Sequence, residues 1–416
     1  MEYRPRVADA DLSARLRRSG AVLVEGAKGC GKTWLASQAA ASTVRVDVDP
    51  NVEAFMEVDP DRLLLGETPR LIDEWQMQPR LWNHIRRAID DRGLPGQFIL
   101  TGSATPDDDV RRHSGAGRFS VMRLRPMSLW ESGHSTGEIS LEGIRRGEPI
   151  PTSSDTGADL ETLAELVIRG GWPSTLGWPL EDAGEYVRDY LDLLVNVDIN
   201  RVSDAKRDPS RVRRLLSSIA RNTATEVSIS TLTRDTGGDG DPLNRETAAA
   251  YLDALELLMV TDNQPAWSTA LRDSATLRKS PKRHLVDPSL AAAALGATKE
   301  SLLREPKTLG TLFESLVIRD LRVYAAAHRG EVFHYRDSAD REIDAIIAYP
   351  DGWIACEIKL GVGAAEKAAE NLKQVASTID SQTVGEPDAR LVITGTGPNY
   401  RRSDRVVVLS IATMKH

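Results

Sequence analysis

The segment GAKGCGKT, at Gly26–Thr33, constrains the fold of this chain more than any other. Two glycines with four residues between them, followed by a lysine and a threonine, are typical of a loop whose backbone N–H groups close around phosphate oxygens. Such a loop requires a strand before it and a helix after it, because the helix N-terminus adds partial positive charge. The apolar run AVLVEG (Ala21–Gly26) precedes the loop, and WLASQAA follows it. The sequence therefore predicts a strand, a phosphate loop and a helix in direct succession.

Residues 20–125 continue this alternation of short apolar runs and helical patterns. The segment LWNHIRRAID places Leu81, Ile85 and Ile89 on one helical stripe. We expect four strands, at Ala21–Gly26, Thr43–Asp49, Arg70–Glu74 and Gln97–Ser103. Alternating strands and helices predict an α/β fold with a parallel sheet, whose ligands bind at the carboxyl ends of its strands.

The phosphate loop predicts ATP and Mg²⁺ as ligands of the chain. Lys32 is expected to reach the β- and γ-phosphates, and the hydroxyl of Thr33 is expected to coordinate Mg²⁺. The residues expected to contact the nucleotide are Gly26, Ala27, Lys28, Gly29, Cys30, Gly31, Lys32 and Thr33. We interpret Cys30 as a small residue that fills the loop, with a redox-sensitive nucleotide site as the alternative.

Polar side chains also end the third and fourth predicted strands. Asp73 is expected to hold Mg²⁺ either directly or through one of the ion's ligands, and Glu74 beside it can polarise the attacking water. Two solvated acids at a strand end are the alternative. Ser103 or Thr101, at the end of the next strand, is expected to sense the γ-phosphate through its hydroxyl.

Arg118 lies in a loop, HSGAGRF, before the next apolar segment. A loop arginine here can act as an arginine finger on the γ-phosphate of a neighbouring subunit. An ordinary surface arginine is the alternative. The first interpretation predicts a homo-oligomer.

Charge and cysteine content narrow the class of protein. The formal net charge of −8 argues against non-specific nucleic-acid binding by the whole surface. A local basic strip, Arg201–Arg221, is compatible with DNA contact, and a solvated helix face is the alternative. No apolar run reaches the roughly 18 residues that span a bilayer, and the first residues lack the apolar core of a signal peptide. Two cysteines, Cys30 and Cys356, are too few for a disulfide framework, so we expect a cytoplasmic protein without a membrane partner.

Four regions are expected along the chain: an ATPase core at 1–135, a linker and helical region at 136–205, a winged-helix-like module at 206–300 and a second α/β domain at 301–416. The polar stretch Gly133–Ala158 is interpreted as a flexible linker. In the third region, three predicted helices precede TDNQPAW, which is expected to begin a wing or strand. This order is typical of a winged helix–turn–helix, a fold that contacts DNA or protein.

The last region combines carboxylates with a lysine on successive predicted elements. Glu357 and Lys359 lie two residues apart on one strand, so their side chains share a face. Asp344 on the preceding strand and Glu314 on the helix before it can complete a divalent-metal shell. Lys359 can orient or deprotonate a water. Such a group predicts a second metal, Mg²⁺ or Mn²⁺, and metal-assisted phosphodiester hydrolysis.

The helix-borne glutamate, the strand order and the ExK pair resemble the PD-(D/E)XK nuclease superfamily. The resemblance implies an α/β nuclease-like domain at 301–416. Cutting activity is a separate question. The alternative is a degenerate nuclease fold that binds nucleic acid or protein, with Glu357 and Lys359 as an ion pair on a strand surface.

The order of motifs along nearly the whole chain resembles a prokaryotic AAA-type ATPase with a DUF4143 carboxyl-terminal region. The first half is similar through the phosphate loop, LIDEWQ (Leu71–Gln76), ILTGSA (Ile99–Ala104), AGR (Ala116–Arg118), LRPMSLWE (Leu124–Glu131) and GGWP (Gly170–Pro173). The second half is similar through YLDALELLMV (Tyr251–Val260), PKRHLVDPSLAAAALG (Pro281–Gly296), LFES (Leu312–Ser315), HYRDSADREIDAII (His334–Ile347) and CEIKLG (Cys356–Gly361). Trp75 departs from the smaller aliphatic residue expected after the acidic pair, which predicts altered packing beside the γ-phosphate.

The resemblance implies an ATPase coupled to a nuclease-like module. The leading interpretation is an ATPase motor or switch whose nucleotide state moves a winged-helix and nuclease-like tail on DNA. An alternative is an ATP-dependent regulatory or assembly module, whose catalytically inactive tail binds protein or nucleic acid. A third interpretation is an antitoxin-like or defence component that acts through partners.

Overall fold

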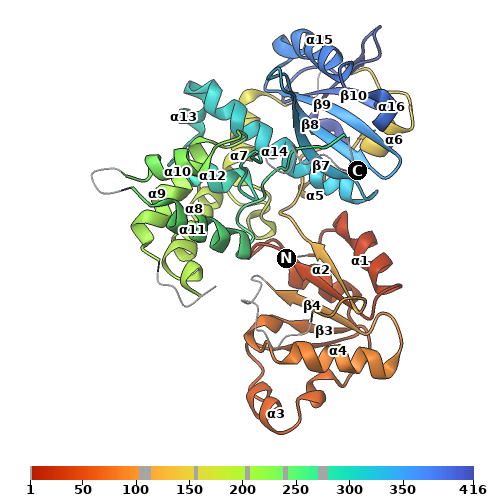
Figure 1. Cartoon of the computed structure of the whole chain (residues 1–416), viewed down its shortest axis with the longest axis vertical. Coiled ribbons are helices and arrows are strands. Elements are labelled where there is room, and N and C mark those ends of the chain that lie inside the picture. The colour runs from red at the N-terminus through yellow and green to blue at the C-terminus, as the bar shows by residue number, and fades with distance from the viewer. Residues whose placement is uncertain (1, 103–113, 154–157, 202–206, 238–241, 270–279) are drawn as a thin grey trace. The chain divides into compact units, whose positions relative to one another are not determined.

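The computed structural model describes residues 2–102, 114–153, 158–201, 207–237, 242–269 and 280–416 (Figure 1). These residues divide into two compact units. Unit 1 comprises Met1–Pro126, Asp198–Lys206 and Ala254–Val260, and unit 2 comprises Met127–Val197, Arg207–Asp253 and Thr261–His416. Each unit contains a sheet of its own. Within the described ranges, every helix is too short or too polar to cross a membrane.

Unit 1 is built on the parallel sheet that the sequence predicts. Its strands are β1 (Ala21–Glu25), β2 (Ser42–Arg45), β3 (Arg70–Asp73), β4 (Phe98–Gly102) and β5 (Phe119–Arg123). They lie in the order β2-β3-β4-β1-β5, and every pairing is parallel. The prediction of a parallel sheet is confirmed. β2 ends at Arg45, four residues earlier than expected, because the chain turns there and the N–H of Asp49 bonds the carbonyl of Arg45.

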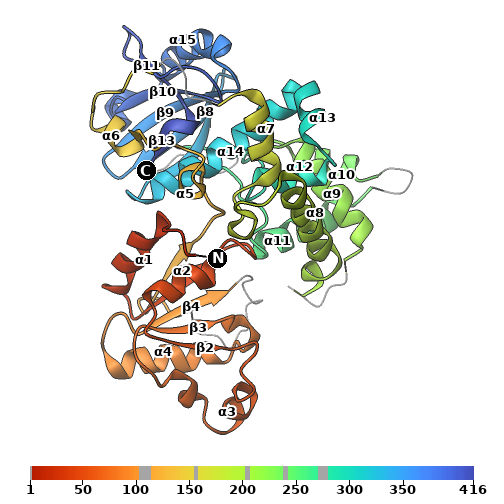
Figure 2. The same cartoon turned by 180° about the vertical axis from the view of Figure 1, so that it is seen from behind.

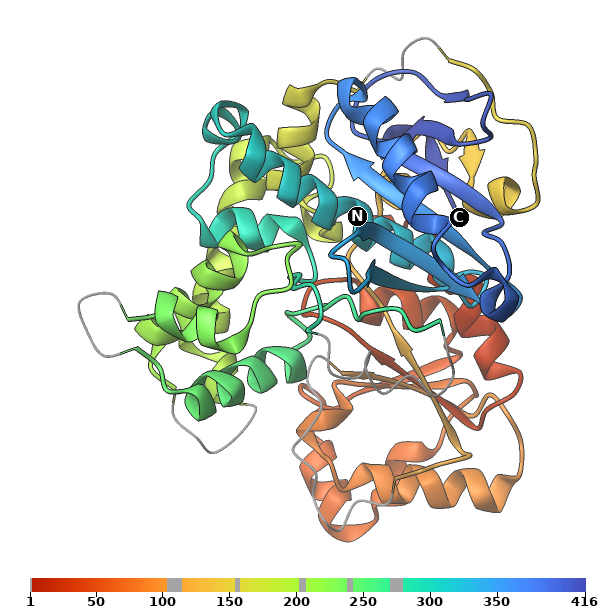
Figure 3. The same cartoon turned by 45° about the horizontal axis from the view of Figure 1, so that its top comes forward.

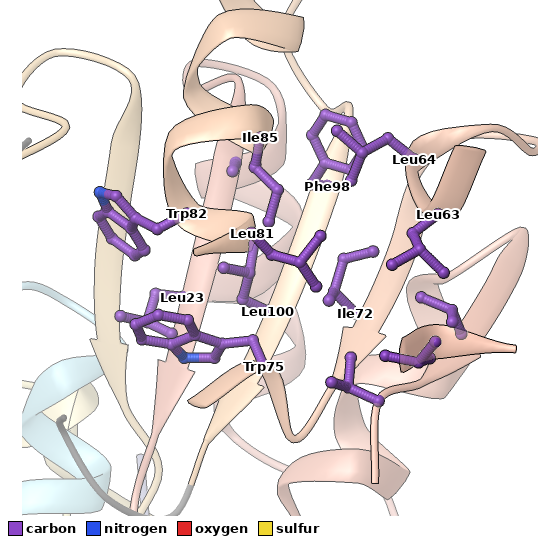
Figure 4. Packing of buried hydrophobic residues seen from close by; sticks show 14 of the residues in the cluster. Leu23, Leu63, Leu64, Ile72, Trp75, Leu81, Trp82, Ile85, Phe98 and Leu100 are labelled. Carbon is purple, nitrogen blue, oxygen red and sulfur yellow. The ribbon is translucent and has the colours of Figure 1, made fainter. Parts of the chain in front are cut away.

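Helices cover both faces of this sheet, as alternating side-chain directions along buried strands require. On one face, α1 (Ala8–Leu16) and α2 (Lys32–Ala39) pack through Leu12, Leu35 and Ala36. On the other face lie α3 (Val52–Val58), the short helix η1 (Pro60–Leu64) and α4 (Leu81–Arg92). Figure 4 shows Leu81, Trp82 and Ile85 of α4 above the strand residues Leu23, Ile72, Phe98 and Leu100. The predicted helical stripe thus faces the sheet.

Helices occupy much of the chain between residues 160 and 304. The sequence predicts those up to residue 257, but it does not predict the two that follow residue 285. The helices are α7 (Leu160–Arg169), α8 (Leu180–Asn196), α9 (Pro209–Arg221), α10 (Ile229–Asp235), α11 (Arg245–Leu257), α12 (Pro288–Ala294) and α13 (Lys299–Arg304). The side chains of Asp159, Asp208 and Ser228 accept a backbone N–H at the starts of α7, α9 and α10. Such caps satisfy donors that the first helical turn leaves without partners. α8 ends at Asn196, where the N–H of Val197 still bonds the carbonyl of Leu193.

Two short arms follow α11, at Thr261–Gln264 and Lys282–Leu285. Antiparallel bridges join Thr261 to Leu285 and Gln264 to Lys282. We call these two arms the 261–285 hairpin. The first arm lies where the sequence predicts a wing, and the winged-helix module itself stays a prediction. The residues after the first arm contact the carboxyl-terminal sheet, which is described next. Ala266 bridges His334, and the N–H of Trp267 bonds the carbonyl of His334.

The second sheet occupies the carboxyl-terminal part of unit 2. After α14 (Pro306–Ala326) come β7 (Glu331–Arg336), β8 (Glu342–Tyr349), β9 (Gly352–Lys359), α15 (Ala365–Ala376), β10 (Ala389–Thr394), β11 (Tyr400–Arg401) and β12 (Val407–Ser410). The strand order is β11-β12-β10-β9-β8-β7, with β8, β9 and β10 side by side in Figure 2. Pairings from β7 to β9 are antiparallel, and those of β10 with β9 and β12 are parallel. α15, drawn in blue, lies across this sheet in Figure 3, with Leu372 and Val375 packed against Trp353.

The stretch predicted as a flexible linker contains regular structure where the chain is described. α5 (Leu129–Ser132) precedes it, and β6 (Ile139–Ser140) and α6 (Leu141–Arg145) lie within it. β6 pairs in parallel with β13 (Met414–Lys415), at the far end of the sequence. Ile139, Leu141 and Ile144 are buried. The prediction was wrong for residues 139–145, because a few apolar residues among many polar ones are sufficient to dock a short segment on a distant strand.

A buried ion-pair network joins four separate segments of unit 2. The guanidinium of Arg319, on α14, contacts Asp287 Oδ2 at 2.8 Å and Asp320 Oδ1 at 2.7 Å. Asp287 also accepts the N–H groups of Gly171 and Ser289, and Asp320 accepts the N–H of Leu129. All three charged side chains are almost fully buried. One arginine therefore holds segments around residues 129, 171 and 287 against α14.

Replacing Arg319 with methionine is expected to destabilise unit 2 by about 3–5 kcal/mol, because it leaves two buried carboxylates without their cation. Calorimetric thermal unfolding measures the effect. Arg188→Met is the matched control, since Arg188 forms an exposed pair with Glu185. Equal melting temperatures for the two variants would contradict a structural role for the network.

Candidate functional site

The phosphate loop lies at the carboxyl end of β1, and its backbone requires glycine at two positions. A Cβ atom on Gly26 would lie 2.2 Å from the carbonyl oxygen of Leu124, and 2.9 Å from Cys30 Sγ. Gly31, the residue before α2, has a φ of 101°, in the left-handed region that glycine tolerates. The loop therefore lies close to the segment that follows β5. The N-terminus of α2 points toward the centre of the loop.

Lys32 and Thr33 begin α2, and both side chains contact groups of the expected site. Lys32 is buried, and its Nζ donates to the carbonyls of Gly26 and Ala27 at 2.9 and 3.0 Å. Thr33 Oγ1 donates to Asp73 Oδ1 at 2.9 Å. The sequence assigned both residues to Mg²⁺ without predicting their contact, and the fold brings the two together although β4 lies between β1 and β3.

Thr101 supports Asp73 rather than facing outward. It is fully buried at the end of β4, and its hydroxyl donates a short hydrogen bond to Asp73 Oδ1. One carboxylate oxygen of Asp73 thus accepts from two hydroxyls, which fixes its orientation. Ser103, the other residue expected to sense the γ-phosphate, lies outside the described residues.

Glu74 adopts a strained backbone conformation at the strand end. Its φ of 55° lies in the left-handed region, where a non-glycine residue costs about 1–2 kcal/mol. Its Oε2 accepts a hydrogen bond from Gln76 Nε2 at 2.5 Å. Strain of this kind clusters at functional sites, where surrounding contacts hold the residue in place. Gln76 was not among the residues predicted from the sequence.

Trp75, which follows the acidic pair, packs in the core of unit 1. It is 2% exposed, and its ring lies 5.1 Å from that of Trp82 on α4. A Cβ on Gly102 would lie 2.8 Å from Gln76 Oε1 and 3.0 Å from the Trp75 nitrogen. The large side chain therefore fixes the turn after β3 against β4, which positions Glu74 and Gln76.

Two further contacts restrain the loop itself. Lys28 Nζ lies 2.6 Å from Asp198 Oδ1, and the lysine is 44% exposed whereas the aspartate is 11% exposed. Asp198 belongs to the short helix η4 (Asp198–Asn200), about 170 residues later in the chain but within unit 1. Arg6 donates to the carbonyls of Cys30 and Arg125. Cys30 is buried and forms no disulfide, and its Sγ donates to the carbonyl of Leu124 at 3.5 Å, so the residue fills the loop as a small side chain.

Arg118 lies at the amino end of the parallel strands, whereas the phosphate loop lies at their carboxyl end. It immediately precedes β5, and its carbonyl accepts the N–H of Ala21 at the start of β1. The five residues of β1 separate the amino end of the strand, beside Arg118, from the start of the loop by about 16 Å. The Arg118 guanidinium contacts Asp90 at 2.8 Å. Arg118 is thus far from the loop of its own subunit, and a role in trans stays a prediction.

The residues around the loop fit ATP and Mg²⁺. A glycine-lined cradle that a Cβ would block, a helix N-terminus and a lysine ammonium suit anionic phosphates. Thr33 and Asp73 supply oxygen atoms of the kind that Mg²⁺ binds. Glu74 follows Asp73 in the chain, with its backbone in the left-handed region and its carboxylate bonded by Gln76.

The carboxyl-terminal residues predicted to bind a metal also come together. Lys359 Nζ lies 2.8 Å from Asp344 Oδ2 and 2.6 Å from Glu357 Oε2. The N–H of Ile358 donates to Asp344 Oδ2 at 2.8 Å, and Asn371 donates to Glu357 Oε1 at 3.0 Å. These contacts give both carboxylates protein donors.

A lysine that the sequence analysis did not single out lies among the acids. Lys282, on the 261–285 hairpin, is 2% exposed. Its Nζ lies 2.9 Å from Glu314 Oε1, 2.5 Å from Glu342 Oε1 and 3.8 Å from Asp344 Oδ1. The ammonium therefore lies where Glu314 and Asp344 would share a metal ion.

Burial and charge shift the pKa values of this cluster in opposite directions. Burial, aided by the charge of Asp344, raises the pKa of Glu314 to about 7 and that of Glu357 to about 8. Burial also acts to raise the pKa of Asp344, but Lys359 and Lys282 outweigh it and the net shift is downward. Burial acts to lower the pKa of Lys282, and the three neighbouring carboxylates reverse this direction. The carboxylates thus favour the charged form of Lys282, and the two lysines favour the ionised form of Asp344.

The arrangement does not fit a second divalent metal. Across the part of the chain that the structure describes, no group of three or more His, Cys, Asp or Glu side chains could hold a metal ion. Lys282 and Lys359 lie between the carboxylates that the sequence analysis assigned as ligands. The prediction of a metal held by Glu314, Asp344 and Glu357 is therefore unsupported, because acids close in space can be neutralised by lysines as well as by a cation from solution.

The basic strip predicted near α9 is partly neutralised. Arg213 contacts Asp192 of α8 at 2.6 Å, and Arg211 lies 3.9 Å from Asp208. Residues 202–206 of the strip lie outside the described residues. These pairs favour a solvated helix face over a dedicated DNA surface.

Sequence reasoning missed Gln76, Asp198 and Lys282. Each touches a predicted site residue through its side chain. Gln76 was within the quoted motif LIDEWQ, and Lys282 was within PKRHLVDPSLAAAALG, so both had a motif but no assigned chemistry. Asp198 has no local signal, because its partner is distant in the sequence.

Three protein-family models match successive parts of the chain. An AAA domain matches residues 18–132, a domain of unknown function, DUF8612, matches 160–301, and a second domain of unknown function, DUF4143, matches 309–414. The uncharacterized proteins Rv2008c of Mycobacterium tuberculosis and Mb2031c of Mycobacterium bovis are each 25% identical to this chain over 410 residues, which is 97% of this chain and 83% of each relative. A Walker-type ATPase of Pyrococcus abyssi aligns with a TM-score of 0.40 and 14% identity, over 70% of this chain and 99% of that chain. The chain therefore carries an AAA domain at residues 18–132 and a DUF4143 domain at residues 309–414.

Proposed function

We propose that this protein is an ATP-driven switch, in which ATP hydrolysis in unit 1 accompanies partner binding by a carboxyl-terminal domain that does not cut nucleic acid. The observation that carries the ATPase half is the contact of Thr33 with Asp73 beside the loop that holds Lys32. The match to an AAA domain supports the same activity.

Each residue of the site has a role that follows from its position. Lys32 and the loop N–H groups bind and orient the phosphates, and Lys28 adds a second cation at the loop. Thr33 and Asp73 would hold Mg²⁺, which would neutralise charge at the transferred phosphoryl group. Glu74 accepts the proton of the attacking water, with Gln76 as its positioning residue. Thr101 keeps Asp73 oriented.

The lysines between the acids favour a carboxyl-terminal domain without catalytic activity over a metal-dependent nuclease. A metal-dependent nuclease needs carboxylate oxygens that are open to a cation and to water. In the described part of the domain, Asp344 and Glu357 have protein donors, and Lys282 lies among the acids. Binding of nucleic acid or protein by this domain requires no metal.

We also expect this protein to form a homo-oligomer and to contact DNA. Arg118 is exposed enough to reach a neighbouring subunit, at 38% side-chain exposure, although Asp90 pairs with it in this structure. A homo-oligomer would let Arg118 act in trans on a partner's nucleotide. A reducing cytoplasm suits the two free cysteines, Cys30 and Cys356.

Two substitutions separate binding from turnover in unit 1. Lys32→Ala is expected to lose ATP affinity, because the loop loses its buried cation. Glu74→Gln is expected to bind ATP normally and to lower kcat about 10²–10⁴-fold, because the amide cannot accept the proton. Nucleotide titration and steady-state phosphate release measure both. Normal turnover by the glutamine variant would remove Glu74 from the base role.

The pair of Lys28 with Asp198 predicts an effect on affinity. Asp198→Asn is expected to tighten ATP binding about two- to five-fold, because a half-exposed ion pair of about 0.2–1 kcal/mol no longer competes with phosphate for the lysine. Asp192→Asn, which breaks the surface pair with Arg213, is the control and should leave the Kd unchanged. Weaker binding by the Asp198 variant would show that the pair orders the loop instead.

The inactive tail predicts intact DNA. Plasmid and single-stranded DNA, incubated with the protein, ATP and either Mg²⁺ or Mn²⁺, are expected to run unchanged on a gel while ATP is hydrolysed. Metal-dependent cutting that disappears in Asp344→Ala would establish a nuclease and overturn this half of the proposal.

A further inference from the structure

The 261–285 hairpin inserts three polar side chains into the carboxyl-terminal domain. Gln264, Lys282 and His284 are each at most 2% exposed. Gln264 Nε2 donates to the backbone carbonyls of Phe333 and Asp344, at 2.9 and 3.1 Å. His284 Nδ1 lies 3.1 Å from Ser315 Oγ on α14. Buried polar groups require partners, so these contacts specify where the hairpin lies on the domain.

The Lys282 ammonium has the surroundings of a bound cation. Glu314 from α14 and Glu342 and Asp344 from β8 direct one oxygen each toward it. The second oxygen of Glu342 contacts Arg336 at 2.7 Å, and that of Asp344 contacts Lys359 at 2.8 Å. The two carboxylates on β8 thus divide their oxygens between Lys282 and another cation of the chain.

We propose that Lys282 is a built-in cation, which takes the place of a divalent metal between Glu314, Glu342 and Asp344 and clamps the hairpin to the carboxyl-terminal sheet. Three carboxylates so close together need a positive charge, because an uncompensated buried charge is costly. The chain supplies that charge from a segment tethered to the domain on both sides.

Tethering explains why the lysine excludes a metal. A group on the same chain has an effective concentration of at least millimolar order at its site, which a dilute metal ion must exceed. Mg²⁺ also gives up its water ligands reluctantly.

Removal of the ammonium is therefore expected to create a metal site. In nucleotide-free protein titrated with Mn²⁺ by calorimetry, we expect no binding by the wild type at this cluster, and one bound Mn²⁺ in Lys282→Ala. Adding Asp344→Asn to the Lys282 variant is expected to abolish the binding. Mn²⁺ at 1 mM should raise the melting temperature of Lys282→Ala and leave that of the wild type unchanged, since a ligand that binds only the folded state stabilises it.

Lys299→Ala is the matched control, because Lys299 pairs with Glu165 at 3.1 Å on the surface of unit 2. It should gain no Mn²⁺ site. Should Lys282→Ala fail to fold, Lys282→Met keeps most of the side-chain stem without its charge and is titrated in the same way. Absence of a new Mn²⁺ site in the folded variant would overturn the proposal. Mn²⁺ binding by the wild type that Asp344→Asn removes would overturn it as well.

Discussion

Unit 2 depends on the buried guanidinium of Arg319. A planar group with five donors can bind Asp287 and Asp320 at once, and each aspartate then accepts backbone N–H groups from another segment. Segments that lie far apart in the sequence meet at this point, and several of them carry the motifs of the family resemblance, such as GGWP and VDPS. These motifs, which suggest function when they are read in sequence, therefore serve architecture in this unit.

At both candidate sites, partners from the protein hold the charged side chains, but the consequences differ. In unit 1, Lys32 bonds loop carbonyls, and Asp73 is held by two hydroxyls. Those neutral contacts leave the charges of Lys32 and Asp73 available for phosphate and Mg²⁺. In the carboxyl-terminal domain, acids meet lysines of the same chain. Carboxylates and a lysine at the expected strand positions are therefore insufficient to identify a metal centre. Lysines from elsewhere in the chain can occupy the place between the carboxylates that a metal ion would take.

Much of the fold follows from local patterns. Buried strands flanked by helices predicted the parallel sheet of unit 1. In the last region, the sequence predicted the helix that carries Glu314 and the strands that carry Asp344, Glu357 and Lys359, which are α14, β8 and β9. β5, β6 and β12 were missed, and residues 139–145 were misread as linker. These strands are short or lie in polar surroundings, so their stability comes from pairing with distant strands, as between β6 and β13. Pairing partners of that kind leave no local signal.

The sequence by itself determined the phosphate loop, the acids at the end of β3 and the positions of Asp344, Glu357 and Lys359 on neighbouring strands, because loop geometry and strand periodicity are local properties. Tertiary structure alone decided the rest. It brought Asp198 to Lys28, turned Glu74 into a left-handed conformation beside Gln76, and inserted Lys282 among three carboxylates. Each of these outcomes depends on charges or packing between segments distant in sequence, and electrostatic neutralisation acts through space rather than along the chain.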